Sequence, residues 1–478
     1  MLKTFVIFLC IVLFSQIQPW PVFGGKTSFA NDQNGKSITK SAMKTLDELL
    51  RRIKGFVSTI NNPSDNFKEG KTNITRKTFR DDDTIENSGL FDGDIRLSKK
   101  QAEYLIDTVA EVAEELGANV SDIVGDAKTR KKRKIDMRFD YEWELTIPYI
   151  VNAGVDRNLV REALSKLESE TCLRFQEHKV FPRGQAGLKY FPGDGCYSSV
   201  GRQSLNELQE ISIGPGCNFI PTIQHETMHA LGFTHEQSRA DRDKYLQILI
   251  NNVKDFAIEN FLKLQLTDAL DYGLPYDYGS AMHYNSYSFS KNGEPTMLPY
   301  NPLYQMTMGS KPEATFLDIM TLNLYYCEDV CPNTISCKNN GYQDPNYCER
   351  CKCLKGFTGR DCSEIEKDRL CGDQELTADN SLKVFNVQGE KDCVYHIKSS
   401  RYSKVFIYVK TTFIYPSYPH SCRADNKLEV KFQSNKTTSG AFLCEESTQK
   451  FLSENDHVMI RFTSTKRDNF ADIYYQLQ

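Results

Sequence analysis

The 478-residue chain lacks several features that would point to particular classes of protein. After the first 25 residues it contains no run of about 18 apolar residues, so we expect neither a membrane span nor a membrane anchor. The 59 basic and 63 acidic residues leave a formal net charge of −4, which argues against nucleic acid as a partner. Cysteine is missing from residues 26–133, although the whole chain has 15. The length is sufficient for three or four domains.

The start of the chain has the layout of a secretory signal peptide. Lys3 precedes an apolar run from Phe5 to Phe14, which is too short to span a bilayer, and the chain turns polar at Ser15. Removal of residues 1–25 would also remove Cys10 and leave 14 cysteines, an even number that allows complete pairing. A buried N-terminal helix, the alternative, would not explain the even count. We therefore expect a secreted, extracellular, oxidised protein.

The cysteine-free segment 26–133 has two amphipathic stretches that predict helices with buried apolar faces. Their apolar residues recur at helical spacing and are Met43, Leu46, Leu49, Leu50, Ile53 and Phe56 in the first stretch, and Leu97, Leu105, Ile106, Val109, Val112 and Leu116 in the second. The segment ends in the basic run Arg130 to Lys134. In a secreted chain, such a run is a cleavage site for a proprotein convertase. We expect cleavage between Arg133 and Lys134, which makes residues 26–133 a propeptide.

The remaining chain divides into three parts by composition. Residues 134–328 mix a predicted strand, 145–151, with a helix that Asp156 can cap, as expected for an α+β domain. Six cysteines then fall within the 32 residues from 331 to 362, too short a segment for a core without disulfides. From residue 371 to 478, apolar residues alternate in four separate stretches, and this period of two predicts an all-β sandwich.

The strongest motif is HETMHALGFTH, from His225 to His235. Residues four apart on a helix share a face, so His225 and His229 can bind one metal ion with Glu226 beside it as a general base for water. Gly232 can turn the backbone sharply and bring His235 in as a third ligand. Three neutral nitrogen ligands with one open position suit a single zinc ion.

A second motif, Ser280 to Tyr284, reads SAMHY and lies about 50 residues downstream, where it fits the methionine turn beneath such a site. Met282 alone would be ordinary core packing. The two motifs together predict a metzincin-type zinc metallopeptidase.

The continuation HEQSRADRD from His235 to Asp243, with the tyrosine that ends SAMHY, resembles the astacin family, and the resemblance extends over residues 134–328. It implies that His225, His229 and His235 bind zinc, that Glu226 is the catalytic base, and that Tyr284 is a transient fifth ligand that supports the transition state. It further implies a role for Glu236 at the buried new N-terminus, and the disulfides Cys172–Cys327 and Cys196–Cys217.

The propeptide also contains a family motif. Phe91-Asp92-Gly93-Asp94 matches the F-x-G-D motif of astacin propeptides, whose aspartate binds the zinc and keeps the precursor inactive. Asp94 is therefore the expected latch, with an ordinary polar turn as the alternative. The spacing from Lys134 to Trp143, nine residues, is close to the distance between mature start and WELTIP-type motif in this family, and it supports cleavage after Arg133.

The two C-terminal parts resemble extracellular modules. Residues 329–363 resemble an EGF-like domain, which implies the pairs Cys331–Cys348, Cys337–Cys351 and Cys353–Cys362, and residues 371–478 resemble a CUB domain, which implies Cys371–Cys393 and Cys422–Cys444. The sequence gives little support for calcium, because residues 328–330 fit the calcium-binding EGF pattern poorly. Asp425 stands where calcium-binding CUB domains place a ligand, but 464–467 lacks the later aspartate.

Three asparagines lie in N-x-S/T triplets and are candidate glycosylation sites: Asn73, Asn119 and Asn435. Together, these features predict a secreted zinc endopeptidase that is made as a zymogen and cleaves extracellular proteins in matrix, cuticle or egg-envelope processing, such as moulting or hatching. The alternative is a catalytically weak binding or scaffold protein that acts through its EGF-like and CUB modules. The complete set of ligands and base at His225, Glu226, His229 and His235 favours the enzyme.

Overall fold

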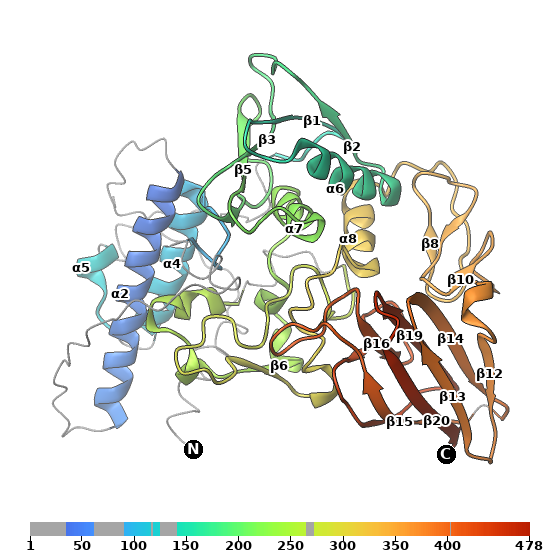
Figure 1. The fold of residues 1–478 in the computed structure, drawn as a ribbon. Coiled ribbons are helices and arrows are strands. Elements are labelled where there is room, and N and C mark those ends of the chain that lie inside the picture. Colours follow the sequence, from blue (N-terminus) through green and yellow to red (C-terminus); the bar gives the residue numbers. More distant parts are fainter. Residues whose placement is uncertain (1–34, 62–89, 116–117, 125–140, 264–271, 402) are drawn as a thin grey trace.

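The computed structural model describes residues 35–61, 90–115, 118–124, 141–263, 272–401 and 403–478 (Figure 1). The expected signal peptide, Asn73, and the expected cleavage site at Arg133 and Lys134 lie outside these residues. None of the helices in the described part of the chain is long and apolar enough to cross a membrane.

Helices α2 (Gly35–Asn61) and α4 (Lys99–Glu115) lie against one another and carry the short α5 (Ser121–Val124) (Figure 1). Their contact buries Leu46 and Leu49 of α2 together with apolar residues of α4. The two helices predicted from apolar spacing are therefore confirmed. Leu97, just before α4, belongs to the same core, whereas Leu116 lies outside the described residues.

The next part of the chain builds a five-stranded sheet in the order β2-β1-β3-β5-β4. Its strands are β1 (Thr146–Val151), β2 (Arg174–Glu177), β3 (Gly187–Phe191), β4 (Cys196–Tyr197) and β5 (Leu208–Ile213). Strands β1, β2, β3 and β5 are parallel, whereas β4 is antiparallel to β5 and forms one edge.

Two helices pack on this sheet. Helix α6 (Arg157–Glu170) begins after Asp156, whose carboxylate accepts hydrogen bonds from the amides of Asn158 and Leu159, as the sequence predicts. Helix α7 (Ile220–Ala230) contacts both α6 and β5. The apolar core between them includes Ile147, Leu164, Leu188, Ile211, Ile223 and Met228. This core fixes the helix that carries the first two histidines of the zinc motif.

After α7 the chain forms short elements with little regular structure, and then helix α8 (Phe316–Tyr326), which Thr315 and Asp318 begin with a capping box. The short elements are η2 (Glu236–Ser238), η3 (Arg242–Lys244), β6 (Leu246–Ile248), η4 (Ile250–Asn252), η5 (Asp255–Phe261), β7 (Met297–Pro299) and η6 (Pro302–Tyr304). Strands β6 and β7 pair in antiparallel fashion.

The disulfide-rich part consists of two small antiparallel pairs, β8 (Tyr342–Gln343) with β9 (Cys351–Lys352) and β10 (Phe357–Thr358) with β11 (Glu364–Ile365). Three disulfides join it: Cys331–Cys348, Cys337–Cys351 and Cys353–Cys362. These are the pairs that the EGF-like resemblance implies.

After the short η7 (Arg369–Cys371), the last part is a sandwich of two sheets, with strand orders β12-β14-β19-β16-β17 and β13-β20-β15-β18 (Figure 1). The strands are β12 (Glu375–Ala378), β13 (Lys383–Gln388), β14 (Lys391–Ser399), β15 (Val405–Phe413), β16 (Lys427–Lys431), β17 (Ala441–Leu443), β18 (Gln449–Leu452), β19 (His457–Ser464) and β20 (Phe470–Leu477). The alternating apolar residues, such as Val405, Ile407 and Val409, point into the core, so the predicted sandwich is confirmed.

Disulfides Cys371–Cys393 and Cys422–Cys444 lie in the sandwich, and Cys172–Cys327 and Cys196–Cys217 lie in the preceding part. All 14 cysteines from Cys172 onward are thus paired.

The candidate calcium ligand Asp425 is already engaged. Its two carboxylate oxygens accept from Arg423 Nε and Nη2, both at 2.8 Å. The side chains of the glycosylation candidates Asn119 and Asn435 are both exposed.

Candidate metal centre and active site

Helix α7 places His225, Glu226 and His229, and the turn after it places His235. Trp143 Nε1 donates to the carbonyl of Ala230 at 2.8 Å, which anchors the end of the helix. The chain then turns at Gly232, whose φ of 113° is strained for any residue with a Cβ atom. This turn is the one that the motif predicts.

The three imidazoles converge on one carboxylate from the N-terminal segment. Asp94 Oδ2 lies 3.1 Å from His225 Nε2 and 3.3 Å from His235 Nε2, and its Oδ1 lies 3.5 Å from His229 Nε2. One ligand atom from each of these four residues lies within 4.8 Å of every other. The structure therefore brings together all four residues that the sequence predicts around the metal.

The other ring nitrogens fix the orientation of the histidines. His225 Nδ1 lies 2.7 Å from the Ala281 carbonyl, and His229 Nδ1 lies 2.8 Å from the Phe233 carbonyl. A carbonyl only accepts hydrogen bonds, so Nδ1 carries the proton in both rings and Nε2 presents a lone pair. Such outer contacts orient the histidines of metal sites.

This donor set fits a zinc ion. Two unprotonated Nε2 atoms and an aspartate carboxylate face one another, and a cation between them would relieve their repulsion. Within the described residues, Asp94 Oδ1 and Glu226 Oε2 are buried without a hydrogen-bond partner. Burial lowers the pKa of His229 to about 4, which keeps this ring neutral and able to bind metal. Zinc binds imidazole nitrogen and carboxylate oxygen in this way.

Glu226 is 1% exposed, and burial together with the Asp94 charge raises the pKa of its carboxyl well above the ordinary value. A carboxyl with a raised pKa is suited to take and return a proton near neutral pH.

Tyr284 and Met282 occupy the places that the methionine-turn motif predicts. The Tyr284 ring centroid lies 4.7 Å from that of His235, and its hydroxyl donates a hydrogen bond to the Asp92 carbonyl. Met282 is 1% exposed within the core under α7, and its carbonyl accepts from the Glu236 amide at 2.9 Å. The tyrosine is therefore hydrogen-bonded to the N-terminal segment at Asp92, which lies two residues before Asp94.

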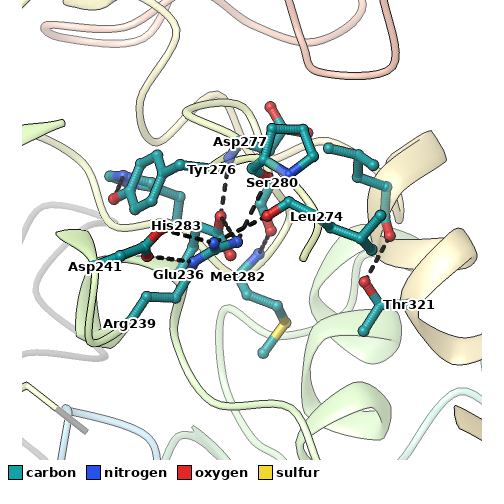
Figure 2. A network of polar contacts seen from close by, with 12 residues as sticks. Glu236, Arg239, Asp241, Leu274, Tyr276, Asp277, Ser280, Met282, His283 and Thr321 are labelled. Atoms are coloured by element: carbon teal, nitrogen blue, oxygen red, sulfur yellow. Dashed lines mark hydrogen bonds and ion pairs between the residues drawn. The ribbon is translucent and has the colours of Figure 1, made fainter. Parts of the chain in front are cut away.

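Glu236 lies in a buried polar network (Figure 2). Its Oε1 accepts from Arg239 Nη1 at 3.2 Å and from the Asp277 amide at 2.8 Å, and Arg239 also pairs with Asp241. Burial raises the pKa of Glu236 to about 8, against the opposing charge of Arg239. The docking of a new N-terminus against Glu236 stays a prediction, because Lys134 lies outside the described residues.

Asp92 is a site residue that the sequence reading missed. It is 1% exposed; its Oδ2 lies 3.3 Å from His235 Nδ1 and accepts from Ser238 Oγ at 3.1 Å. It therefore orients the third histidine, as carbonyls orient the other two. The sequence offered one indication of this role, because Asp92 is a second aspartate within the same four-residue motif, Phe91 to Asp94.

Three histidines around one point, a buried glutamate beside them and a methionine turn below define the class: a zinc metalloendopeptidase. Residues 136–327 match the family model described as Astacin, a peptidase family. The chain is 32% identical to zinc metalloproteinase nas-34 of Caenorhabditis elegans, over 94% of this chain and 74% of that protein. The chain belongs to the astacin family.

Other relatives are longer than this chain. It is 33% identical to zinc metalloproteinase nas-37 and 36% identical to zinc metalloproteinase dpy-31, both of Caenorhabditis elegans, over 79% and 59% of this chain. The match covers 46% of each of these two relatives. Among solved structures, high choriolytic enzyme 1 of medaka fish (Oryzias latipes), a hatching enzyme zinc-protease, matches 39% of this chain and 94% of its own, with 32% identity and a TM-score of 0.35.

Proposed function

We propose that this metalloendopeptidase is a secreted zymogen in which residues 26–133 cover the active site until cleavage after Arg133 by a proprotein convertase. The observation that supports this most directly is the position of Asp94 among the three histidines. In this proposal, His225, His229 and His235 hold one zinc ion, and Asp94 occupies its remaining position in the precursor.

The backbone around Asp94 supports the same idea. The Ser198 amide donates to the Asp94 carbonyl at 3.0 Å, and the Arg96 amide donates to the Ser198 carbonyl at 2.8 Å. Ser198 directly follows edge strand β4, so the N-terminal segment uses hydrogen-bonding groups that an extended peptide substrate would otherwise find there.

We assign the chemistry of peptide hydrolysis to two side chains. Zinc, when bound, supplies Lewis-acid chemistry and lowers the pKa of water to about 7. Glu226 takes the proton of the attacking water and returns it to the leaving amine. The Tyr284 hydroxyl donates a hydrogen bond to the oxyanion that develops on the scissile carbonyl, once the Asp92 carbonyl no longer occupies it.

The seven disulfides support an oxidising, extracellular location. We propose that 329–363 is an EGF-like domain and 371–478 a CUB domain, and that the peptidase domain spans 134–328. The substrates would then be extracellular proteins of a matrix, cuticle or egg envelope. The nematode relatives nas-34 and dpy-31, both named zinc metalloproteinases, support the peptidase part of this proposal.

The alternative is a binding protein whose peptidase domain is inactive. The complete set of Glu226, Tyr284 and three converging histidines favours the enzyme.

Cleavage of casein or gelatin by the convertase-treated chain tests the proposal. We expect activity that Glu226→Ala abolishes while the variant keeps its zinc. Glu162→Ala, at an exposed glutamate of α6 in the retained domain, is a suitable control and should not change the activity of the cleaved chain. Equal activity of wild type and Glu226→Ala would refute the assigned base.

A further inference from the structure

The C-terminal sandwich lies directly on the loop that carries the methionine turn. Ser439, just before β17, donates its amide to Asp277 Oδ1 at 2.9 Å and its hydroxyl to Asp277 Oδ2 at 3.2 Å. Ser439 is 8% and Asp277 2% exposed, so both hydrogen bonds are buried. Asp277 thus receives two of its hydrogen bonds from a residue 162 positions away in the sequence.

The contact is too close to be incidental. A Cβ atom added to Gly279 would lie 2.4 Å from Ser439 Oγ and 2.5 Å from Ser439 Cβ. Glycine at position 279 is therefore what leaves room for the Ser439 side chain against the loop. Beside it, Thr307 Oγ1 donates to the Gly440 carbonyl at 3.2 Å and accepts from the Phe442 amide at 3.0 Å.

Apolar packing continues this interface. Tyr304 of η6 lies near Phe432 of the sandwich, with ring centroids 5.9 Å apart, and the Cys422 amide donates to the Met306 carbonyl at 2.9 Å. The buried apolar residues of both parts form one continuous core. The sandwich and the part of the peptidase domain between α7 and α8 therefore share one hydrophobic core.

Asp277 connects this interface to the active site by two routes. Its amide donates to Glu236 Oε1 at 2.8 Å, next to His235 in the chain (Figure 2). Its carbonyl accepts from the Ser280 amide at 3.1 Å, within the loop 277–284.

The loop 277–284 in turn fixes the positions of two active-site side chains, His225 and Tyr284. The Ala281 carbonyl holds His225 Nδ1 at 2.7 Å, and the loop ends at Tyr284. Asp318 holds the same loop from α8, because its carboxylate accepts from Ser280 Oγ at 2.7 Å and from the Ala281 amide at 3.0 Å. The loop is thus held from two sides, one of which is the sandwich.

We propose that the C-terminal sandwich, through the contact of Ser439 with Asp277, positions the loop 277–284, so that Asp277 and Ser439 are positioning residues for His225 and Tyr284. The inference rests on the peptidase function assigned above and extends it. The sandwich then acts on catalysis itself.

The test compares Ser439→Asp with the control Ser434→Ala in the full chain. Ser439→Asp would place a second carboxylate against Asp277, whereas Ser434 is an exposed serine whose hydroxyl bonds to Glu454 within the sandwich. Activity is measured after convertase treatment on a peptide of about eight residues, too short to span from the cleft across a second domain. Zinc retention is measured separately, by competition with a chelator.

We expect Ser439→Asp to lower kcat about tenfold or more with little change in KM, the size expected when a hydrogen bond to a buried charged group is lost. Zinc retention should fall by a similar factor, because the loop orients His225. Adding Asp277→Asn should restore part of both, since an amide can donate to the new carboxylate. Ser434→Ala should behave as wild type.

Wild-type kcat and zinc retention in a folded Ser439→Asp chain would overturn the inference. If that variant does not fold, Ser439→Ala decides in the same way: a loss of kcat of about threefold or more relative to Ser434→Ala supports the inference, and equality overturns it. A wild-type chain that cleaves nothing would refute the peptidase function instead, and the zinc competition would still decide whether the sandwich positions the histidine.

Discussion

Replacing Asp94 by Ala in a precursor that cannot be cleaved tests the proposal that the N-terminal segment suppresses activity through this carboxylate. The background carries Arg130→Ala and Arg133→Ala, which remove both arginines of the basic run 130–134, including the one after which cleavage is proposed. Asp94 is 1% exposed and contacts His225, His229 and His235 at 3.1 to 3.5 Å, so its removal leaves the metal position open without disturbing α2 or α4.

The expected gain in peptidase activity follows from the interactions that Asp94→Ala removes and from those that remain. A hydrogen bond to a charged group contributes about 1.5–3 kcal/mol, so the loss of one such bond should raise the population of the open site about 10- to 150-fold. Two backbone hydrogen bonds of Ser198 with the segment remain, at 3.0 and 2.8 Å, and so does the bond from Tyr284 to Asp92. Activity should therefore rise, but stay below that of the cleaved enzyme.

The assay measures hydrolysis of a quenched fluorescent peptide by precursors with equal zinc content. Asp122→Ala serves as the matched control, because Asp122 lies in the same segment but pairs with Arg52 at 2.6 Å, on the exposed surface. The control should stay as inactive as the uncleavable precursor. If Asp94→Ala, loaded with zinc, also stays inactive, the aspartate is not the latch and the segment inhibits by steric cover alone.

Three further predictions concern the cleaved enzyme and the sandwich. Phenanthroline should abolish activity and added zinc restore it, and full activity of metal-free protein would contradict the mechanism. Tyr284→Phe should lower kcat about 10- to 100-fold with unchanged zinc content and nearly unchanged KM, because the hydroxyl acts on the transition state; loss of zinc would make it a structural ligand instead. The stacked pair of His396, which is buried, and His457, which is partly buried, should weaken the sandwich in acid. His396 Nδ1 lies 3.1 Å from His457 Nε2, and desolvation lowers the pKa of His396 from 6.5 to about 4 and that of His457 to about 3. The unfolded chain binds protons first, so the free energy of unfolding should fall as pH drops from about 6.5 towards 4, by up to about 3 kcal/mol per histidine. Urea unfolding of wild type and His457→Gln at pH 7 and pH 5 measures this fall in the free energy of unfolding. An equal fall in the two proteins would contradict the role of His457.

Most of what could be predicted about the site came from short motifs of adjacent residues. Helical spacing puts His225 and His229 on one face of α7, and Gly232 supplies the turn to His235, so the zinc motif is visible in eleven adjacent letters. Period-two stretches likewise predicted strands of the sandwich, because alternation follows from the geometry of a strand buried on one face.

Contacts between distant segments could not be read in this way. Asp277 and Ser439 lie in stretches without periodicity, and what joins them is the packing of two parts of the chain. Asp92 orients His235 across 143 positions for the same reason. The engagement of Asp425 by Arg423 is local, but it depends on which way two side chains turn, and residue order does not fix that choice.

The position of Asp94 in the same chain as the histidines has a consequence for the direction of activation. While the segment is attached, the local concentration of the carboxylate at the histidines is on the order of millimolar, so weak contacts suffice to keep the site closed. After the proposed cleavage at Arg133 the segment would be a separate molecule at the far lower concentration of the enzyme itself. Dilution then removes the inhibitor, and a rise in affinity of several orders of magnitude would be needed to close the site again. In the proposed zymogen, activation by a single cut would therefore be one-way without any change in the contacts themselves.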